Sequence, residues 1–337
     1  MKMDVAMLVQ NPADAREFAA AAEAEGFSGV YTFEGRNDPL LSLAIASQHT
    51  RTLELMTGVV VAFGRSPLTL AHTAYDVHLM SQGRLILGLG TQVKAHIERR
   101  YSMPWSKPAA RMREFVQALR AIWQSWQSGD PLAFEGQFYR HTLMMPTFSP
   151  GPNPFGTPKV FLAGVGPAMV RVAGEVGDGH IVHPFHTARY LREHSLPALE
   201  QGFAASGRKR DQFEISCQII VATGFTDDEI RQATEAARRQ IGFYASTPTY
   251  LPVLESMDRV DIHAPLLEMS RRGQWEAMGT LVDDDLLHAV AAVGTPAEIA
   301  ERILESRGAL VDRLSPVAYG RDMRIFTSVN REINRLV

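Results

Sequence analysis

The chain has 337 residues, of which 45% are hydrophobic and 21% are charged, close to the average for soluble globular proteins. This composition is sufficient for a sizeable core, and we therefore exclude a disordered chain. The formal net charge of −3 provides no broad positive field, so we exclude nucleic acid and membrane as partners and expect a small-molecule substrate.

The chain start and the cysteine content bear on the compartment. The N-terminal segment reaches Asp14, Arg16 and Glu17 without a small-residue cleavage site and does not resemble a secretory signal. The single cysteine, Cys217, lies in an apolar run, which excludes an internal disulfide and a cysteine-cluster metal site. We therefore expect a cytoplasmic protein with a buried structural thiol.

Eight short apolar runs alternate with longer segments at helical spacing, a pattern typical of a parallel sheet built from βαβ units. The predicted strands are 3–9, 29–33, 53–61, 84–89, 159–163, 179–183, 213–223 and 313–318. The alternation predicts one (β/α)₈ TIM barrel domain over residues 1–337.

Two helix starts that follow predicted strands carry strong local signals. Ser66 precedes Pro67, which places an N-cap residue before a proline at the first helical position. Thr295 precedes Pro296, and Glu298 stands where a capping-box carboxylate belongs. Both are consistent with barrel connectivity.

Two regions exceed a minimal barrel, and we predict them to be insertions at the C-terminal face, about 132–158 and 246–285. The first contains a predicted hairpin around 135–137, and the second carries the acidic run 283–285. The acidic run is interpreted as a solvated helix start, with a metal site as the alternative. Long excursions on this side of a barrel commonly form lids or substrate walls.

Glycine-rich segments follow two of the predicted strands. The run SQGRLILGLG ends at Gly90, and glycines at a strand end let a ligand approach the backbone closely, although a tight turn alone would also explain them. The predicted strand 159–163 leads into Gly164, Val165 and Gly166 at a helix start, where backbone N–H groups and the helix dipole can hold a phosphate. The next predicted strand ends beside this mouth at His183.

The segment 64–67, the run SQGRLILGLG and the stretch FLAGVGPAMVRVAGEVGDG occur in the order and spacing that resemble the luciferase-like superfamily over most of the chain. The segment 293–298 also resembles the start of that superfamily's final helix. The resemblance implies a barrel that holds either FMN or the deazaflavin coenzyme F-420. The stretch GLGTQVKAHIERRY, followed by 111–114, is more similar to the F-420-dependent group, so F-420 is favoured over FMN.

The resemblance also implies site residues. Thr57-Gly58-Val59 matches the place where family members have a bulge, often a non-prolyl cis peptide, beneath the central ring of the cofactor. We expect the Gly58–Val59 bond to have this form. The predicted cofactor-binding residues are Gly58, Val59, Gly90, Thr91, Gly164, Val165, Gly166 and His183.

Glu34 is the candidate proton-transfer residue. Several F-420 enzymes place Asp-His where this chain has Phe33-Glu34, and Val93 occupies a position where a carboxylate is common in that group. A carboxylate at the end of a barrel strand can have its pKa raised by desolvation. The alternative is a salt bridge from Glu34 to Arg36 or Arg65.

Arg65, His96 and Trp105 follow the third and fourth predicted strands and are candidates for the substrate pocket. His183 and His186 form a pair, but no third ligand at metal-binding spacing accompanies them, so no metal is predicted.

The predicted function is hydride transfer between F-420 and an unidentified small organic substrate at the C-terminal mouth of the barrel. The alternatives are an FMN-dependent luciferase-like monooxygenase and a non-catalytic flavin-binding barrel. The resemblance further implies a homodimer through the helices beside the second and third strands, where the apolar residues Leu40, Leu41, Leu43, Ile45 and 72–77 exceed what one helix face needs.

Overall fold

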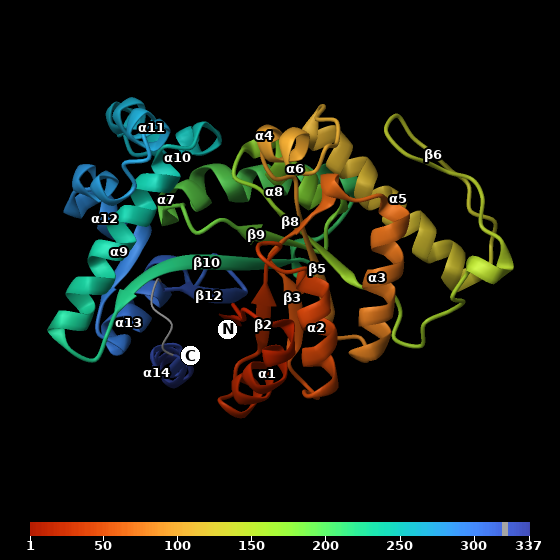
Figure 1. Cartoon of the computed structure of the whole chain (residues 1–337), viewed down its shortest axis with the longest axis horizontal. Helices are drawn as coiled ribbons and strands as arrows, with labels where there is room; N and C mark the ends of the chain where they lie inside the picture. Colours follow the sequence, from red (N-terminus) through yellow and green to blue (C-terminus); the bar gives the residue numbers. More distant parts are fainter. Residues whose placement is uncertain (319–322) are drawn as a thin grey trace.

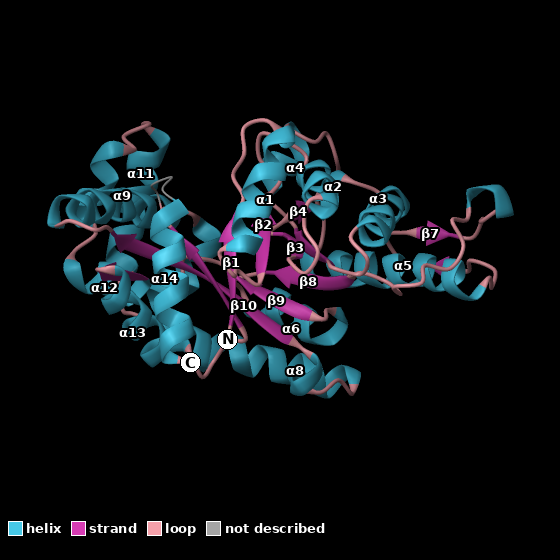
Figure 2. Cartoon of the chain, turned by 90° about the horizontal axis from the view of Figure 1, so that it is seen from below, coloured by secondary structure: helices cyan, strands magenta, loops and turns pink. Residues whose placement is uncertain are grey.

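The computed structural model describes residues 1–318 and 323–337 and contains a closed parallel barrel surrounded by helices (Figures 1 and 2). The barrel strands, in their order around the ring, are β1 (Lys2–Ala6), β2 (Gly29–Thr32), β3 (Glu54–Thr57), β5 (Leu85–Gly90), β8 (Lys159–Ala163), β9 (Gly179–Val182), β10 (Glu214–Thr223) and β12 (Arg313–Val317). Pairing of β12 with β1 closes the ring. The predicted (β/α)₈ TIM barrel is confirmed, and every predicted strand is present.

The helices lie outside the barrel (Figure 2). They are α1 (Ala15–Ala24), α2 (Pro39–Gln48), α3 (Pro67–Met80), α4 (Lys94–Arg99), α5 (Pro108–Ser128), α6 (Pro167–Val176), α7 (Ala188–Tyr190), α8 (Leu196–Ser206), α9 (Asp227–Ala245), α10 (Leu251–Glu255), α11 (His263–Arg271), α12 (Asp284–Val290), α13 (Pro296–Arg307) and α14 (Met323–Leu336). Ser66 caps α3, and Thr295 with Glu298 forms the capping box of α13, as predicted. None of the described helices is long and apolar enough to cross a membrane.

The excursions from the barrel lie toward opposite ends of the long axis of the molecule (Figure 1). The first contains the predicted hairpin, formed by β6 (Phe134–Glu135) and β7 (Arg140–His141). The second contains α10 and α11 and leads into α12, and these helices pack with α9 on a second hydrophobic cluster that also includes Ile220 and Ala222 of β10. Asp283 accepts a hydrogen bond from the backbone N–H of Leu286, so the acidic run is a helix start, as predicted.

Two short strands refine the predicted pattern. The predicted strand 53–61 is interrupted after Thr57, and β4 (Val60–Val61) resumes it against β5. The strand β11 (Ala291–Gly294) pairs with the far half of β10, outside the barrel ring. The sequence did not indicate β11, because its four residues precede the strong helix signal at Thr295 and include two alanines, which favour strands weakly.

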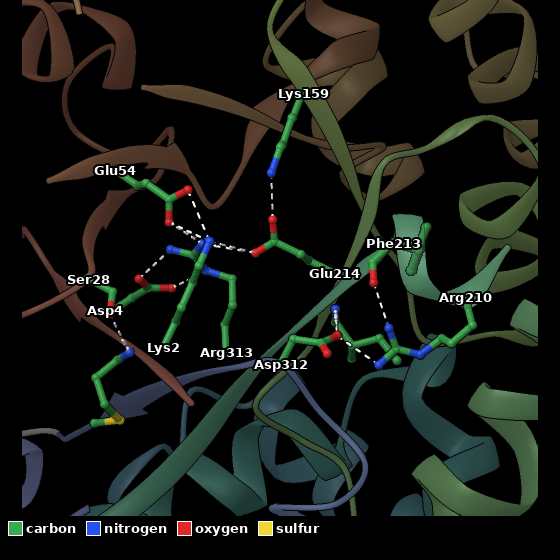
Figure 3. A network of polar contacts seen from close by, with 12 residues as sticks. Lys2, Asp4, Ser28, Glu54, Lys159, Arg210, Phe213, Glu214, Asp312 and Arg313 are labelled. Carbon is green, nitrogen blue, oxygen red and sulfur yellow. Dashed lines mark hydrogen bonds and ion pairs between the residues drawn. The ribbon is translucent and has the colours of Figure 1, made fainter. Parts of the chain in front are cut away.

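A charged cluster occupies the barrel interior at the amino ends of the strands (Figure 3). The Arg313 guanidinium is fully buried and donates to both carboxylate oxygens of Asp4, at 2.6 and 2.9 Å. It also donates to Glu54 and Glu214, and the Lys2 ammonium bridges the same two carboxylates. Above this cluster lies an apolar layer of Tyr31, Met56, Ile86, Phe161 and Ile181. Two filled layers therefore close this end of the barrel to ligands.

Candidate active site at the barrel mouth

A cavity of about 720 Å³ lies at the carboxyl ends of the strands, above the filled layers. Its lining comes from the segments after β3, β5 and β8, from β9 and β10, and from the second excursion. The first excursion contributes no lining residue, so it is not the substrate wall that the sequence suggested. The residues are Gly58, Val59, Val61, Gly90–Lys94, Trp105, Pro108, Ala109, Ala163–Met169, Ile181, His183, Gln218, Thr249 and Tyr250. Carboxyl-end loops of this kind form the active sites of (β/α)₈ barrel enzymes.

Small residues form the strand-end wall of this cavity. The Gly58–Val59 peptide bond is cis, as predicted from the sequence. A side chain at Gly90 would place its Cβ 2.6 Å from Val59 Cγ2, and one at Gly58 would lie 3.1 Å from the Tyr31 ring. Packing on Val59 and on Tyr31 therefore requires glycine at Gly90 and favours it at Gly58, and both glycines line the cavity.

The loop between β8 and α6 presents backbone donors to the same cavity. Among the hydrogen bonds of the described residues outside the helices and strand ladders, none uses the backbone N–H of Val165 or Gly166. The Gly164 N–H follows the β8–β9 ladder, in which Ala163 pairs with Ile181. A Cβ added to Gly166 would meet nothing within 4 Å, so the space in front of this helix start is open. Free N–H groups at the amino end of a ten-residue helix suit a phosphate or another anion.

His183 is the imidazole that lines the cavity. Its Nδ1 accepts a hydrogen bond of 3.1 Å from the backbone N–H of Phe185, which leaves the proton of the neutral ring on Nε2. The ring packs on Tyr250 and Tyr244, with centroids 4.4 and 4.8 Å away. Burial lowers the pKa of His183 to about 3, so the ring is neutral at physiological pH. His183 thus offers a neutral N–H donor and no readily exchanged charge.

The rest of the cavity is poor in charge. Lys94 is the only charged residue among the described residues that line it. Gln218 contributes an amide from β10, and a Cβ at Gly58 would lie 3.5 Å from its Nε2. The cavity therefore suits an uncharged and largely apolar reactant beside an anionic group held at Gly164–Gly166.

Glu34 lies outside this lining and forms part of a separate polar cluster. Its carboxylate accepts from the backbone N–H of Val61 at 2.8 Å, from Arg65 at 2.5 Å and from the Tyr101 hydroxyl at 2.8 Å. Arg65 also donates to Asp38. The structure thus contains the salt bridge to Arg65 that was the alternative to proton transfer, and this bridge joins the loops after β2 and β4.

Of the other predicted site residues, some line the cavity and some lie outside it. Gly58, Val59, Gly90, Thr91, Gly164, Val165, Gly166, His183 and Trp105 all line the cavity. Arg65 and His96 do not, and His96 is exposed on α4. The Trp105 ring packs edge-on against Phe63, with centroids 5.8 Å apart.

Comparison with known proteins supports this architecture. The model of the luciferase-like monooxygenase family matches residues 2–313. The chain belongs to this family. It is 48% identical to an uncharacterized protein of Mycobacterium tuberculosis, over 96% of this chain and 95% of that protein. It is 28% identical to a 5,10-methylenetetrahydromethanopterin reductase of Archaeoglobus fulgidus, over 86% and 84% of the two chains.

Solved structures of luciferase-like proteins share the fold. The coenzyme F-420-dependent tetrahydromethanopterin reductase of Methanopyrus kandleri superposes with a TM-score of 0.83, at 20% identity and 99% coverage of both chains. A type II Baeyer–Villiger monooxygenase of Pseudomonas putida, solved with FMN, superposes with a TM-score of 0.71, at 16% identity and with 100% and 98% of the two chains covered. Both F-420 and FMN enzymes therefore occur on this fold.

Five polar residues of the cavity were not predicted from the sequence, namely Gln92, Lys94, Gln218, Thr249 and Tyr250. Gln218 is the single amide within the apolar run 215–222, and that isolated polar residue in a buried strand was an available signal. Tyr250 lies in the second insertion, far along the chain from the barrel mouth it covers, and no local pattern marks it.

Proposed function

We propose that this protein is an oxidoreductase that transfers hydride between coenzyme F-420 and a small, uncharged organic substrate at the barrel mouth. The observation that carries the proposal is one cavity lined both by Gly58, Val59 and Gly90, which would face a ring, and by the helix start at Gly164–Gly166, where the free N–H groups of Val165 and Gly166 would hold its phosphate. The named activity of the Methanopyrus kandleri reductase supports F-420.

Each group of residues that lines the cavity would have its own role in binding or in the reaction. The bound deazaflavin would supply the hydride donor or acceptor. Backbone N–H groups at Gly164–Gly166 would hold the anionic tail, and the neutral Nε2–H of His183 would donate a hydrogen bond to an oxygen or nitrogen in the cavity. Trp105 and Tyr250 would exclude water from the reacting atoms.

FMN is the second candidate cofactor, because its ring and phosphate would use the same two features and an FMN enzyme shares the fold. Bound FMN would make the protein a monooxygenase that uses oxygen. A barrel that binds either cofactor but does not turn over with any acceptor would correspond to the non-catalytic alternative.

The test is a comparison of F-420 and FMN binding by fluorescence titration of the wild type, Gly166→Phe and Gly166→Ala. We expect tighter binding of F-420 than of FMN. Phenylalanine at 166 fills the open space of the phosphate site and should weaken binding tenfold or more, by roughly the 1.5–3 kcal/mol of a charge-assisted hydrogen bond. Alanine, at φ −68°, should bind almost as wild type.

If FMN binds more tightly than F-420, the proposed cofactor is wrong and the alternative cofactor, FMN, takes its place in the proposal. If neither cofactor binds, or if Gly166→Phe binds as the wild type does, the proposed site is wrong.

A further inference from the structure

A second cavity lies on the flank of the barrel, between α7, α13, the end of α12 and the start of β11. Helices α12 and α13 lie toward the left of Figure 1. Its volume is about 510 Å³, and it shares no lining residue with the cavity at the mouth. The proposed hydride transfer uses none of its groups.

Arg307, at the end of α13, lies at the inner wall of this cavity. Its side chain is buried, with the residue 5% exposed, and no carboxylate of the described residues pairs with it. The guanidinium donates to His186 Nε2 at 3.1 Å, to Ser306 Oγ at 2.8 Å and to the Ala289 carbonyl at 3.4 Å. These bonds use three of its five N–H groups, so one N–H on each terminal nitrogen is left for another acceptor.

The groups around Arg307 do not neutralise its charge. His186 donates from Nδ1 to the His183 carbonyl, and burial lowers its pKa well below the ordinary value, so the ring is neutral. Burial raises the pKa of the nearby Cys217 thiol to about 12, which keeps this group neutral as well. A buried cation among neutral groups is costly unless an anion joins it.

The rim of the cavity adds to the positive charge. Arg302 and Arg189 line it, and Glu305 is the only acidic residue among its described lining residues. Arg189 is paired with Glu193, whereas Arg302 donates to the Val293 carbonyl and forms no ion pair with the described residues. The lining thus carries three arginines against one carboxylate.

We propose that this flank cavity binds a small molecule through an oxyanion group, a phosphate or a carboxylate, held between Arg307 and Arg302. A guanidinium presents parallel N–H donors that match the oxygens of both groups. The cavity volume leaves room for the remainder of such a molecule.

The test is isothermal titration with inorganic phosphate, and separately with acetate, at constant ionic strength. Phosphate could also bind at the mouth, so the reference protein is Gly166→Phe, in which that subsite is filled. We expect Gly166→Phe to retain one phosphate site, and Arg302→Gln in that background to weaken it about tenfold, the effect of one charge-assisted hydrogen bond. Arg302 is exposed, so its replacement leaves the buried contacts in place.

Arg307→Gln should abolish the site, and a crystal soaked in phosphate should show the anion between Arg302 and Arg307. Acetate binding as tightly as phosphate would assign the site to carboxylates, and weaker acetate binding would assign it to phosphates. The proposal is overturned if phosphate binding is lost in Gly166→Phe and kept in Arg302→Gln, or if Gly166→Phe binds neither anion. Cofactor binding is measured separately, so failure here is distinct from failure of the proposed function.

Discussion

Glu34 and His183 both follow barrel strands, but their side chains have different roles, because His183 lines the cavity and Glu34 does not. Donors from Val61, Arg65 and Tyr101 converge on the Glu34 carboxylate, so the group joins the loops after β2 and β4. His183 has one nitrogen occupied by a backbone N–H and the other facing its ring neighbours and the cavity. Hydrogen-bond partners, which depend on tertiary structure, decide between these roles.

Five histidines with pKa values lowered by burial make stability depend on pH. Burial lowers the pKa of His180 to about 4 and that of His183 to about 3, and it also lowers the pKa values of His78, His141 and His186, from 6.5 in each case. Because the folded values are depressed, the unfolded chain binds more protons once the pH falls below 6.5. Stability is therefore fully present above 6.5 and is lost as the pH falls toward the folded values.

We expect the free energy of unfolding to fall between about pH 6.5 and about pH 5, by up to about 1.4 kcal/mol per pH unit for each ring. Carboxylates contribute little in this window, since those of the unfolded chain are still mostly ionised. Urea unfolding at several pH values measures the slope, and His183→Gln should reduce it by the share of one ring. A free energy that does not change with pH across this window would contradict the assigned burial.

At the scale of elements, sequence patterns correctly predicted the features that depend only on residues close together in the chain. The alternation of apolar runs and the caps at Ser66 and Thr295 require only neighbouring residues, and the structure reproduces them. Groups brought together from distant strands could not be inferred in this way. Arg313 meets Asp4 across the whole length of the chain, and Tyr250 reaches His183 from an insertion. Glu34 was assigned by resemblance to a family position, and its partners come from two other segments, 61–65 and the segment of Tyr101.

The contact between β3 and β5 gives a sharp prediction. The Thr57 hydroxyl donates to the Gly88 carbonyl and accepts from the Gly88 N–H, both at 2.8 Å, and so holds the two strands close together. A Cβ at Gly88 would lie 1.8 Å from the Thr57 carbonyl oxygen and 2.7 Å from Ile181. Gly88→Ala should therefore destabilise the protein by about 3 kcal/mol or more, because backbone atoms must separate.

The matched control is Gly166→Ala, which adds the same methyl group where nothing lies within 4 Å. Its free energy of unfolding in urea should stay within about 0.5 kcal/mol of the wild type. Equal stability of the two variants would show that β3 and β5 do not approach as closely as described.

At the scale of the whole molecule, the barrel has one closed end and one open end. The cluster around Arg313 satisfies its charges internally and fills the amino-terminal end (Figure 3). The carboxyl-terminal end has small residues and free backbone donors instead. A ligand of the barrel interior therefore approaches from the mouth, where the second insertion places Tyr250.

The outer surface of α2 and α3 suggests how two copies associate. Leu41 on α2 is 59% exposed, and Leu79 and Met80 at the end of α3 are 46% and 42% exposed. The Gln48 side chain at the end of α2 donates to the Met80 carbonyl, so these helices are held next to each other. Leu40 and Leu43, which the sequence pattern had assigned to this face, are instead buried in the core of the protomer. Exposed apolar side chains on packed helices are typical of a protein–protein contact. We propose that this face forms a homodimer.

The change that tests this face is Leu41→Asp, which would bury a carboxylate against apolar groups in the dimer and should weaken association tenfold or more. The control is Leu143→Asp, because Leu143 is 77% exposed in the first insertion, away from α2. Light scattering at micromolar concentration should give a dimer for the wild type and Leu143→Asp, and a shift toward monomer for Leu41→Asp. A monomeric wild type would refute the dimer, and dissociation by Leu143→Asp alone would move the interface to the first insertion.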